Sequence, residues 1–379
     1  MPSQILHILF GEDIIAGIYR RISPFFGIVA DRAMEKLQYI FRTAFALGCQ
    51  GPDIFYHSRK RRPVGLEYGS LLHRRGAGTF TAELLKLGLP DQLPGVEGFS
   101  VKKFPVERLP VEGFPQGSQN LNALGAYALG FMTHAILDRA AHPYIVYKSG
   151  FSNKKSGAQR NSLYHIFFER VLDVLMFRKK RGKNIDAWDQ DVLTEACGKP
   201  PSGLGELLAR ALVFAFPERA GKDEKLARRI DNTFLDCTGF YKYTDPGYVD
   251  SADSRFCTIE ELAYIYPKDL CDSEGNTTVD FLNLENRPWQ YPLEGREQDC
   301  RSFPEIYSDA AESAINSICP VIVSYLETGV FPIDEATQAI GNGGLSIADE
   351  NGKPCIPTLC DPLPLDEILL EQAEMRGIA

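Results

Sequence analysis

Three of the six histidines of this chain fall close together near its middle, and their spacing suits metal binding. In the segment FMTHAILDRAAHPYI, His134, Asp138 and His142 recur every four residues. Because an α-helix turns once in about 3.6 residues, this spacing places the three side chains along one stripe of a helix. Apolar neighbours such as Leu129 and Ile136 flank the stripe. Burying it would be costly unless its polar groups are paired or bind a metal.

A second pair of the same kind follows on the next helical segment. In SLYHIFFERVLD, His165 and Glu169 lie four residues apart among apolar residues. Imidazole and carboxylate groups are ordinary ligands of zinc, and a helix holds two of them in fixed relation at this spacing. One such pair is common without any metal, but the two motifs in succession favour a metal site. Buried His–carboxylate pairs without a metal are the alternative.

The N-terminal third of the chain holds the other candidates, each weaker on its own. Asp53 and His57 lie in CQGPDIFYH, His73 lies in LLHRR, and His7 lies in SQILHILF. A single histidine in such a context is more often a core or surface residue than a metal ligand. These residues become candidate metal ligands only if the fold brings them close to the central motifs.

Helical patterns dominate the chain and predict an all-α fold. The helices are expected at residues 31–47, 79–87, 120–142, 161–181, 203–219, 222–241, 304–328 and 364–376. Asp31 is expected to cap the first and Gly48 to end it, while Asn120 or Asn122 begins the third and Pro143 ends it. Residues 88–118, rich in Gly and Pro, and the polar residues 149–160 are expected to be loops.

The composition is that of a soluble globular protein. Of the 379 residues, 44% are apolar and 24% charged. No apolar run reaches the roughly 18 residues that span a bilayer, and the N-terminus lacks the pattern of a signal peptide. The nine cysteines are odd in number and include no CxxC pair, which is typical of reduced thiols. We therefore expect a cytoplasmic protein without a transmembrane segment.

The net charge of -9 hides an asymmetry between the two halves of the chain. Residues 1–182 carry 25 Lys and Arg against 14 Asp and Glu, whereas residues 183–379 carry 16 against 36. The basic half suggests an anionic ligand or surface, and the acidic half argues against nucleic acid without excluding it. The run Arg59–Arg62 could attract an anionic substrate or lipid surface; a solvated loop is the alternative.

Together these motifs resemble the zinc-dependent phospholipase C family, whose relatives include the fungal single-strand nucleases. The matching pieces come in the family's order: His7, GPDIFY with Asp53, His73, HAILDRAAH, HIFFE and DFLNLENRPWQYP. The resemblance covers roughly residues 5–325 and implies a multi-helix bundle around a metal cluster. We expect one domain over residues 1–330 with an insertion near 183–275, followed by a C-terminal tail at 331–379.

The resemblance implies a site for two or three zinc ions. One ion would be bound by Asp53, His73, His134 and Asp138. A second would be bound by His142, His165 and Glu169. A third would be bound by His7, by Asp138 as a bridge, and by the amine and carbonyl of the first residue of the chain.

The chain departs from the family pattern at that first residue. The secreted members begin, after processing, with a tryptophan whose free amine is a ligand, whereas this chain begins Met1-Pro2. Methionine before proline is readily removed, so the imine nitrogen of Pro2 could take the role. His57 has no counterpart among the family's ligands and is expected behind the ligands or on the substrate side.

The function that the resemblance implies is zinc-dependent hydrolysis of a phosphodiester, with release of a phospholipid headgroup favoured. Water activated by the metal ions would attack phosphorus, and Asp53 would orient or deprotonate that water. A phospholipid substrate would entail peripheral contact with a membrane. Two alternatives stay open: a soluble phosphoesterase or nuclease on the same metal site, and a metal-binding scaffold without turnover.

Overall fold

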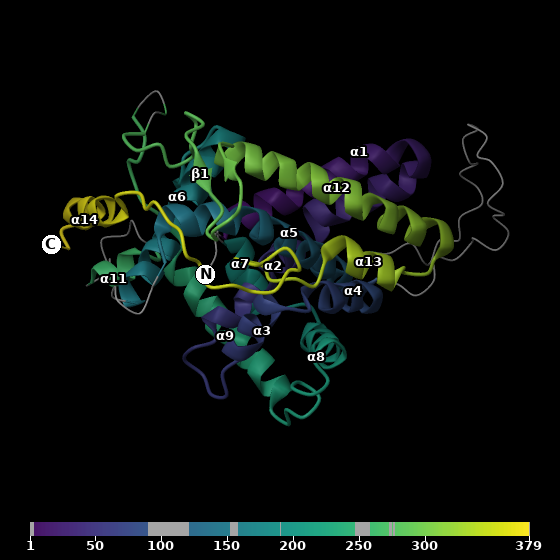
Figure 1. Ribbon diagram of the computed structural model, residues 1–379. Coiled ribbons are helices and arrows are strands. Elements are labelled where there is room, and N and C mark those ends of the chain that lie inside the picture. The colour runs from purple at the N-terminus through teal and green to yellow at the C-terminus, as the bar shows by residue number, and fades with distance from the viewer. Residues whose placement is uncertain are drawn as a thin grey trace.

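Figure 1 shows the computed structural model, which describes residues 4–89, 121–151, 158–189, 191–246, 258–272, 275 and 277–378. Within these ranges the elements are helices, apart from one short antiparallel hairpin of β1 (Trp289–Gln290) and β2 (Gln298–Asp299) and an isolated bridge between Ala348 and Pro354. The prediction of an all-α fold is confirmed.

The helices lie along the chain in the following order. They are α1 (Ile5–Glu35), the π-helix η1 (Lys36–Ile40), α2 (Arg42–Cys49), the 3-10 helix η2 (Gly51–His57), α3 (Leu66–Arg74), α4 (Ala77–Gly88), α5 (Ala123–Ser149), α6 (Ala158–Arg181), the 3-10 helix η4 (Ile185–Ala187), α7 (Asp191–Gly198), α8 (Leu204–Ala215), α9 (Leu226–Tyr243), α11 (Ile259–Leu262), α12 (Phe303–Thr328), α13 (Ile333–Ile340) and α14 (Leu365–Met375).

Helix α5 forms the centre of the fold, between α1 and α12 on one side and α3, α8 and α9 on the other (Figure 1). It is buried on every face, as expected of a helix with apolar residues all around. Asn122 caps it by accepting a hydrogen bond from the N–H of Gly125, as predicted. The predicted end at Pro143 is wrong, because the helix continues to Ser149. Proline lacks the N–H that would make one helical hydrogen bond. The buried ring of Tyr144, which packs against Trp289, offsets that loss and keeps the next turn helical.

Two glycines let α2 lie directly against α5. A Cβ at Gly48 would come within 2.1 Å of the Tyr127 carbonyl oxygen, and one at Gly130 within 2.2 Å of the Phe45 carbonyl oxygen. Gly48 was predicted to end a helix; it lies inside α2 instead, where the close approach of the two backbones requires it. The contact brings the last turn of α2 to the middle of α5.

The prediction of a helix beginning at Asp31 is also wrong. Helix α1 runs from Ile5 to Glu35 and bends at Gly27, whose φ of 42° and ψ of -118° are not helical. The bend folds the second arm of α1 back beside the first, and the Tyr19 hydroxyl donates a hydrogen bond to Asp31 across the arms. Asp31 therefore joins two arms of one helical hairpin.

The remaining segments surround this centre. Helices α7, α8 and α9, from the predicted insertion at 183–275, pack against α2, α4 and η2. Residues 331–379, predicted as a tail, include α13, which packs on α4 and α12, and α14, which packs on α6. The domain boundaries stay a prediction. Residues 90–118 of the predicted loop at 88–118 lie outside the described residues, as do residues 152–157 of that at 149–160. The ends of the second loop were placed wrongly, because Ser149 belongs to α5 and residues 158–160 belong to α6.

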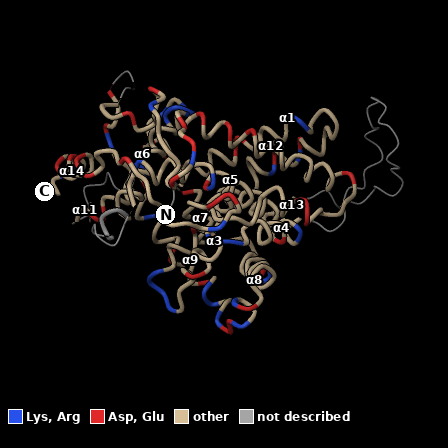
Figure 2. Tube along the Cα trace, in the orientation of Figure 1, with Lys and Arg blue, Asp and Glu red and all other residues tan. Residues whose placement is uncertain are grey.

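Charged residues of both signs are mingled over most of the trace, and a run of blue marks the loop between η2 and α3 (Figure 2). That loop carries Arg59–Arg62, and Asp236 of α9 holds it through the backbone N–H groups of Lys60 and Arg61 and the Arg61 guanidinium. Within the ranges described, no helix combines the length and the apolar character needed to cross a membrane.

Candidate metal centre

The stripe predicted on the central helix faces a cluster of side chains from four other elements. His134, Asp138 and His142 are buried on α5, and the structure brings His7 from α1, Asp53 from η2, His73 from α3, and His165 and Glu169 from α6 to them. All eight predicted ligand residues therefore meet in one region. Their ligand atoms form three groups, each compact enough to hold a metal ion.

The first group is Asp53, His73 and His134; together with Asp138, which contacts both imidazoles, it is named the quartet here. His73 Nε2 lies 3.0 Å from Asp53 Oδ1 and 3.4 Å from Asp138 Oδ2. His134 Nε2 lies 3.3 Å from Asp53 Oδ2 and 3.1 Å from Asp138 Oδ2. These four side chains meet between η2, α3 and α5.

Backbone carbonyls hold the other nitrogen of each imidazole. His134 Nδ1 lies 3.1 Å from the Cys49 carbonyl oxygen, and His73 Nδ1 lies 2.8 Å from that of Gly69. A carbonyl can only accept, so Nδ1 carries the proton, and in the neutral ring Nε2 turns its lone pair to the carboxylates. Orientation of this kind is typical of metal-ligating histidines.

This arrangement fits a bound cation. Lone pairs on Nε2 and on ionised carboxylates repel one another unless the rings are protonated or a cation lies between them. Zinc bonds of about 2.0–2.2 Å in a tetrahedron put ligand atoms about 3.3 Å apart, close to the quartet's contacts of 3.0–3.4 Å. Buried Asp53 Oδ2, His134 Nε2 and Asp138 Oδ2 make no hydrogen bond within the described part of the chain.

The second group joins α5 to α6. Glu169 Oε1 lies 3.2 Å from His165 Nε2 and 3.7 Å from His142 Nε2, and the two imidazole rings are nearly parallel, with centroids 5.6 Å apart. His142 Nδ1 lies 3.0 Å from the carbonyl oxygens of both Asp138 and Leu345. Both imidazoles therefore turn Nε2 toward one carboxylate.

The third group surrounds His7. Its Nε2 lies 3.2 Å from Asp138 Oδ1, and its ring stacks on His134 at 4.0 Å between centroids. Asp138 thus contacts His7 as well as the imidazoles of His73 and His134, which is the contact that the predicted bridge requires. His134 also belongs to the His7 group. Pro2, the other predicted member, lies outside the described residues.

A buried carboxylate on α6 fixes the start of α1 and with it His7. Asp173 accepts hydrogen bonds from the backbone N–H groups of Gln4, at 2.9 Å, and Leu6, at 2.7 Å. These N–H groups belong to the first turn of α1, where they have no helical acceptor and the helix dipole favours a negative charge. Asp173 therefore serves as a remote cap that sets the position of His7.

Gly51 determines how Asp53 meets His134. Its φ of +54° is in the left-handed region, and a Cβ there would lie 2.3 Å from the His134 ring. Only glycine satisfies both conditions. The tight entry into η2 therefore places Asp53 two residues later against the same imidazole.

Burial and neighbouring charges shift the pKa values of these groups in opposite directions. Burial would raise the pKa of Asp138, yet the charge of His134 helps hold it well below its usual range. Burial would lower the pKa of His73, yet Asp53 helps raise it well above its usual value. The pKa of His7 is lowered by burial and by His134. In the metal-free protein, the Asp138 carboxylate is thus strongly favoured in its ionised form.

Burial and neighbouring charges also oppose each other in the group that includes His165 and Glu169 of α6. Burial would raise the pKa of Glu169, but positive groups nearby, His165 among them, lower it overall. Burial lowers the pKa of His165 despite the attraction of Glu169. An ionised carboxylate beside an imidazole that resists protonation is a suitable ligand pair for a divalent cation.

His57 does not join any of the three groups. Its buried ring stacks on Phe240 at 3.8 Å between centroids and meets Tyr241 edge-on. Neither ring nitrogen has a hydrogen-bond partner within the described residues, and burial holds its pKa well below the usual value. It ends η2 and packs against aromatic rings of α9.

The centre opens to solvent between α3 and α6. The side chains of His73 and His165 are 13% and 20% exposed, whereas those of the other predicted ligands are at most 9% exposed. Tyr56 covers part of His73 with its ring, at 4.9 Å between centroids. His73 and His165 are therefore the members of the three groups most exposed to solvent.

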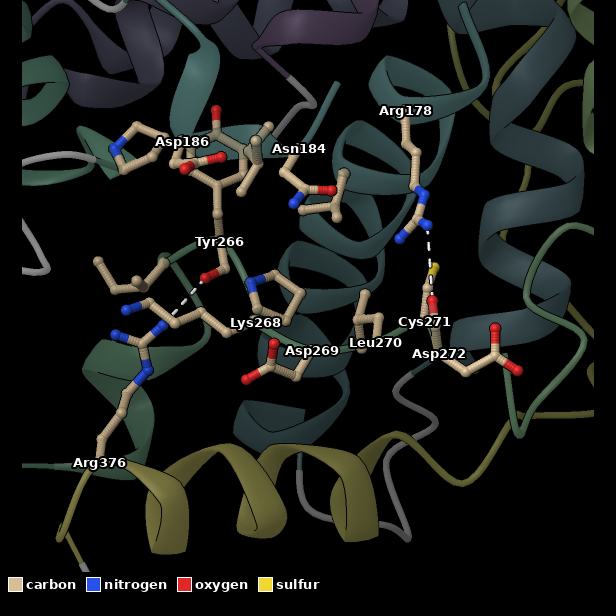
Figure 3. Close-up of a pocket in the computed structure, with 15 residues that line it drawn as sticks. Arg178, Asn184, Asp186, Tyr266, Lys268, Asp269, Leu270, Cys271, Asp272 and Arg376 are labelled. Carbon is tan, nitrogen blue, oxygen red and sulfur yellow. Dashed lines mark hydrogen bonds between the residues drawn. The ribbon is translucent and has the colours of Figure 1, made fainter. Parts of the chain in front are cut away.

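A separate cavity of about 490 Å³ lies beside α6 and the end of α14 (Figure 3). Arg178, Lys268 and Arg376 line it together with Asp186, Asp269 and Asp272, so its charges balance. None of the eight predicted ligands lines it. Its composition does not distinguish an anionic from a cationic ligand.

Sequence reasoning missed the acceptors that orient the imidazoles. They are the backbone carbonyls of Cys49, Gly69 and Leu345. A backbone carbonyl leaves no mark in the residue type, so no pattern could have predicted them. Tyr56 ends the GPDIFY motif, but its place over His73 depends on the turn of η2.

Comparison with known protein families gives a match that spans this region of the chain. A family model described as zinc dependent phospholipase C matches residues 7–203, which contain all eight clustered residues. Neither the curated proteins nor the solved structures include a significant match to the chain. Since the family match spans more than half of the sequence, the chain belongs to the zinc-dependent phospholipase C family.

Proposed function

We propose that this protein is a zinc-dependent phosphodiester hydrolase that releases the headgroup of a phospholipid. The observation that carries the proposal is the quartet, in which His73 and His134 turn Nε2 toward Asp53 and Asp138 while carbonyls hold Nδ1. The family match supports the metal and the reaction class.

The proposed ligands follow the three groups of the centre. Asp53, His73, His134 and Asp138 bind one ion; His142, His165 and Glu169 bind a second; and His7 with Asp138 contributes to a third. Zinc bound in these groups would neutralise charge on the phosphate oxygens and lower the pKa of water.

The side chains around the opening would carry out the remaining tasks. Asp53 is the proposed catalytic residue, because a carboxylate at the quartet can orient the attacking water and accept its proton. The buried residues behind the quartet exclude bulk water, which strengthens every charge interaction at the reacting phosphate.

The α1 hairpin supports a lipid substrate. Phe25 and Ile28, at its bend, are 69% and 41% exposed. Residues 14–30 include Arg20 and Arg21 and no acidic residue, and both arginines are exposed. Exposed apolar side chains next to cations are typical of segments that bind the surface of an anionic membrane. We propose that this bend contacts the membrane.

A soluble phosphoesterase or nuclease would use the same ligands. Tyr56 favours this second candidate, because an aromatic ring at the opening could stack a nucleobase. A scaffold that binds metal without turnover is the third possibility and differs from both in activity.

The test begins with zinc per chain, measured by elemental analysis on protein purified without chelator. We expect two or three ions in the wild type and the loss of at least one in His134→Ala. The matched control is His57→Gln, a buried histidine outside the three groups, which should keep the full complement. Absence of stoichiometric metal from the wild type would refute the proposal.

Activity then separates the candidates. Headgroup release from phosphatidylcholine vesicles in excess over hydrolysis of single-stranded DNA supports the phospholipase. The reverse order supports the nuclease. A zinc-loaded protein inert on both substrates and on bis(p-nitrophenyl) phosphate supports the scaffold.

A further inference from the structure

Residues 341–363, here named the C-terminal strap, cross the metal centre although they lie far outside the region matched by the family model. The strap leaves α13 and passes the end of α3 before reaching α5. Its Asn342 binds the start of α4, where its side chain accepts a hydrogen bond from the N–H of Thr79 at 2.8 Å. Its far end is fixed by backbone hydrogen bonds from Asp361 and Leu363 to the carbonyls of Tyr147 and Lys148.

One residue of the strap, Leu345, connects two of the ligand groups. The Leu345 N–H donates to the His73 carbonyl at 2.9 Å, and the Leu345 carbonyl oxygen lies 3.0 Å from His142 Nδ1. His73 belongs to the quartet and His142 to the group on α6. Leu345 itself is fully buried, so solvent does not compete for either bond.

The carbonyls of Leu345 and Asp138 lie equally far from His142 Nδ1, but that of Leu345 comes from outside the helix. The other acceptor of Nδ1, the Asp138 carbonyl, lies four residues earlier on the same helix and is also the ordinary acceptor of a backbone N–H. A carbonyl from outside the helix has no such competing bond. It can therefore fix the tautomer and the ring orientation that point Nε2 at Glu169.

Arg139 holds the strap in register. Its guanidinium donates to the carbonyls of Ile340 at 2.8 Å, and of Gly341 and Gly343 at 3.4 Å each. Arg139 follows Asp138 directly on α5, so it ties the strap to the helix that carries three of the ligands. These bonds set where Leu345 meets His142.

We propose that the C-terminal strap is part of the metal centre and that Arg139 is a positioning residue. Arg139 holds the strap so that the Leu345 carbonyl orients the imidazole of His142. This inference rests on the proposed zinc function. It implies a selective effect, because His73 and His134 take their Nδ1 acceptors from Gly69 and Cys49, which are not in the strap. The group of His142, His165 and Glu169 should depend on Arg139 more than the quartet, which the strap reaches only through the backbone carbonyl of His73.

The test uses Arg139→Met in the full-length chain, which removes the donors and keeps an unbranched side chain. We expect zinc affinity, measured by competition with a chromophoric chelator, to fall about 10–100-fold for one ion only. Arg139→Lys, which keeps one donor group, should restore part of that affinity. Equal zinc affinities in Arg139→Met and wild type overturn the inference.

The matched control is Arg229→Met. Arg229 is also half-buried and donates to a backbone carbonyl, that of Val64 at 2.6 Å, but it does not contact the strap. It should lower thermal stability without changing the affinity for any one ion. If both variants lose the same ion equally, the effect is a general loss of stability and the inference fails.

A measurement on folded wild-type protein covers the case in which Arg139→Met does not fold. In zinc-loaded protein with ¹⁵N-labelled histidine, the Nδ1 proton of His142, assigned with His142→Gln, should be protected from exchange with solvent. Rapid exchange would contradict the bond to Leu345. A wild type that binds no zinc refutes the proposed function itself, whereas unchanged affinities in a zinc-loaded Arg139→Met refute only the role of the strap.

Discussion

Asp53 and Asp138 contact the same two imidazole nitrogens from opposite elements, η2 and α5. Asp138 alone extends further, with its second oxygen 3.2 Å from His7 Nε2. Both carboxylates therefore contact the imidazoles of His73 and His134, but only Asp138 also contacts His7. This difference gives each a distinct expected phenotype.

Asp138→Asn should remove more zinc than Asp53→Asn. The amide keeps the shape of the side chain but loses the charge, and Asp138 serves both the quartet and the His7 group. Asp53→Asn should lose at most one ion and lower kcat by about 100-fold or more, the range typical of a lost general base. Zinc per chain and kcat on bis(p-nitrophenyl) phosphate check both. Equal zinc loss in the two variants would contradict the bridging role of Asp138.

Gly51→Ala should damage the centre more than Gly182→Ala. Both glycines have positive φ, of +54° and +64°, so both variants bear similar backbone strain. A Cβ at position 51 would meet the His134 ring, whereas one at 182 meets nothing within 4 Å. We expect an extra loss of about 1–3 kcal/mol in the free energy of unfolding from this overpacking, together with weaker zinc binding. Urea unfolding and zinc titration measure it, and equal effects at the two sites would disprove the contact.

The stabilisation by zinc should grow with pH. In the chelated protein, the pKa values of His73 and His134 lie above the unfolded value of 6.5. Their contribution to stability is complete below that value and is lost as pH rises through the folded pKa. Zinc binds the neutral imidazole, so it competes with protons over the same range. The Tm difference between zinc-loaded and chelated protein should widen from about pH 6 to about pH 8. A constant or narrowing difference would contradict the assignment.

Phe25 and Ile28 should contribute to vesicle binding. Replacing both with serine should weaken partitioning onto phosphatidylserine-containing vesicles by tenfold or more, because each buried side chain is worth about 1.5–3 kcal/mol. Turnover of bis(p-nitrophenyl) phosphate should not change, since the bend is not part of the metal centre. The control is Phe214→Ser, an aromatic side chain 51% exposed on α8. Co-sedimentation measures binding, and equal losses in variant and control would exclude the α1 bend as the membrane contact.

The sequence by itself determined the helical class and the ligand pairs within single helices. His134, Asp138 and His142, like His165 and Glu169, are set by helical periodicity, which is a local property of the chain. The cap at Asn122 is equally local. The family's motifs extended the set to His7, Asp53 and His73, and the fold brings these residues to the others.

Local signals failed where distant parts of the chain compete with them. Gly48 reads as the end of a helix but is required for the contact with α5, and Pro143 lies inside a helix that packing continues. Asp31 reads as a cap but bonds Tyr19 across the bend of α1. In each case the residue type is compatible with more than one local structure, and tertiary contacts decided which one forms.

Only the tertiary structure decided how the ligands are oriented. The carbonyls of Cys49, Gly69 and Leu345 set the imidazoles, and Arg139 places the last of them through the C-terminal strap. Every residue has such a carbonyl, so its presence carries no sequence information. Which carbonyl meets an imidazole depends on how distant segments pack, because the hydrogen bond requires a distance near 3 Å and correct alignment.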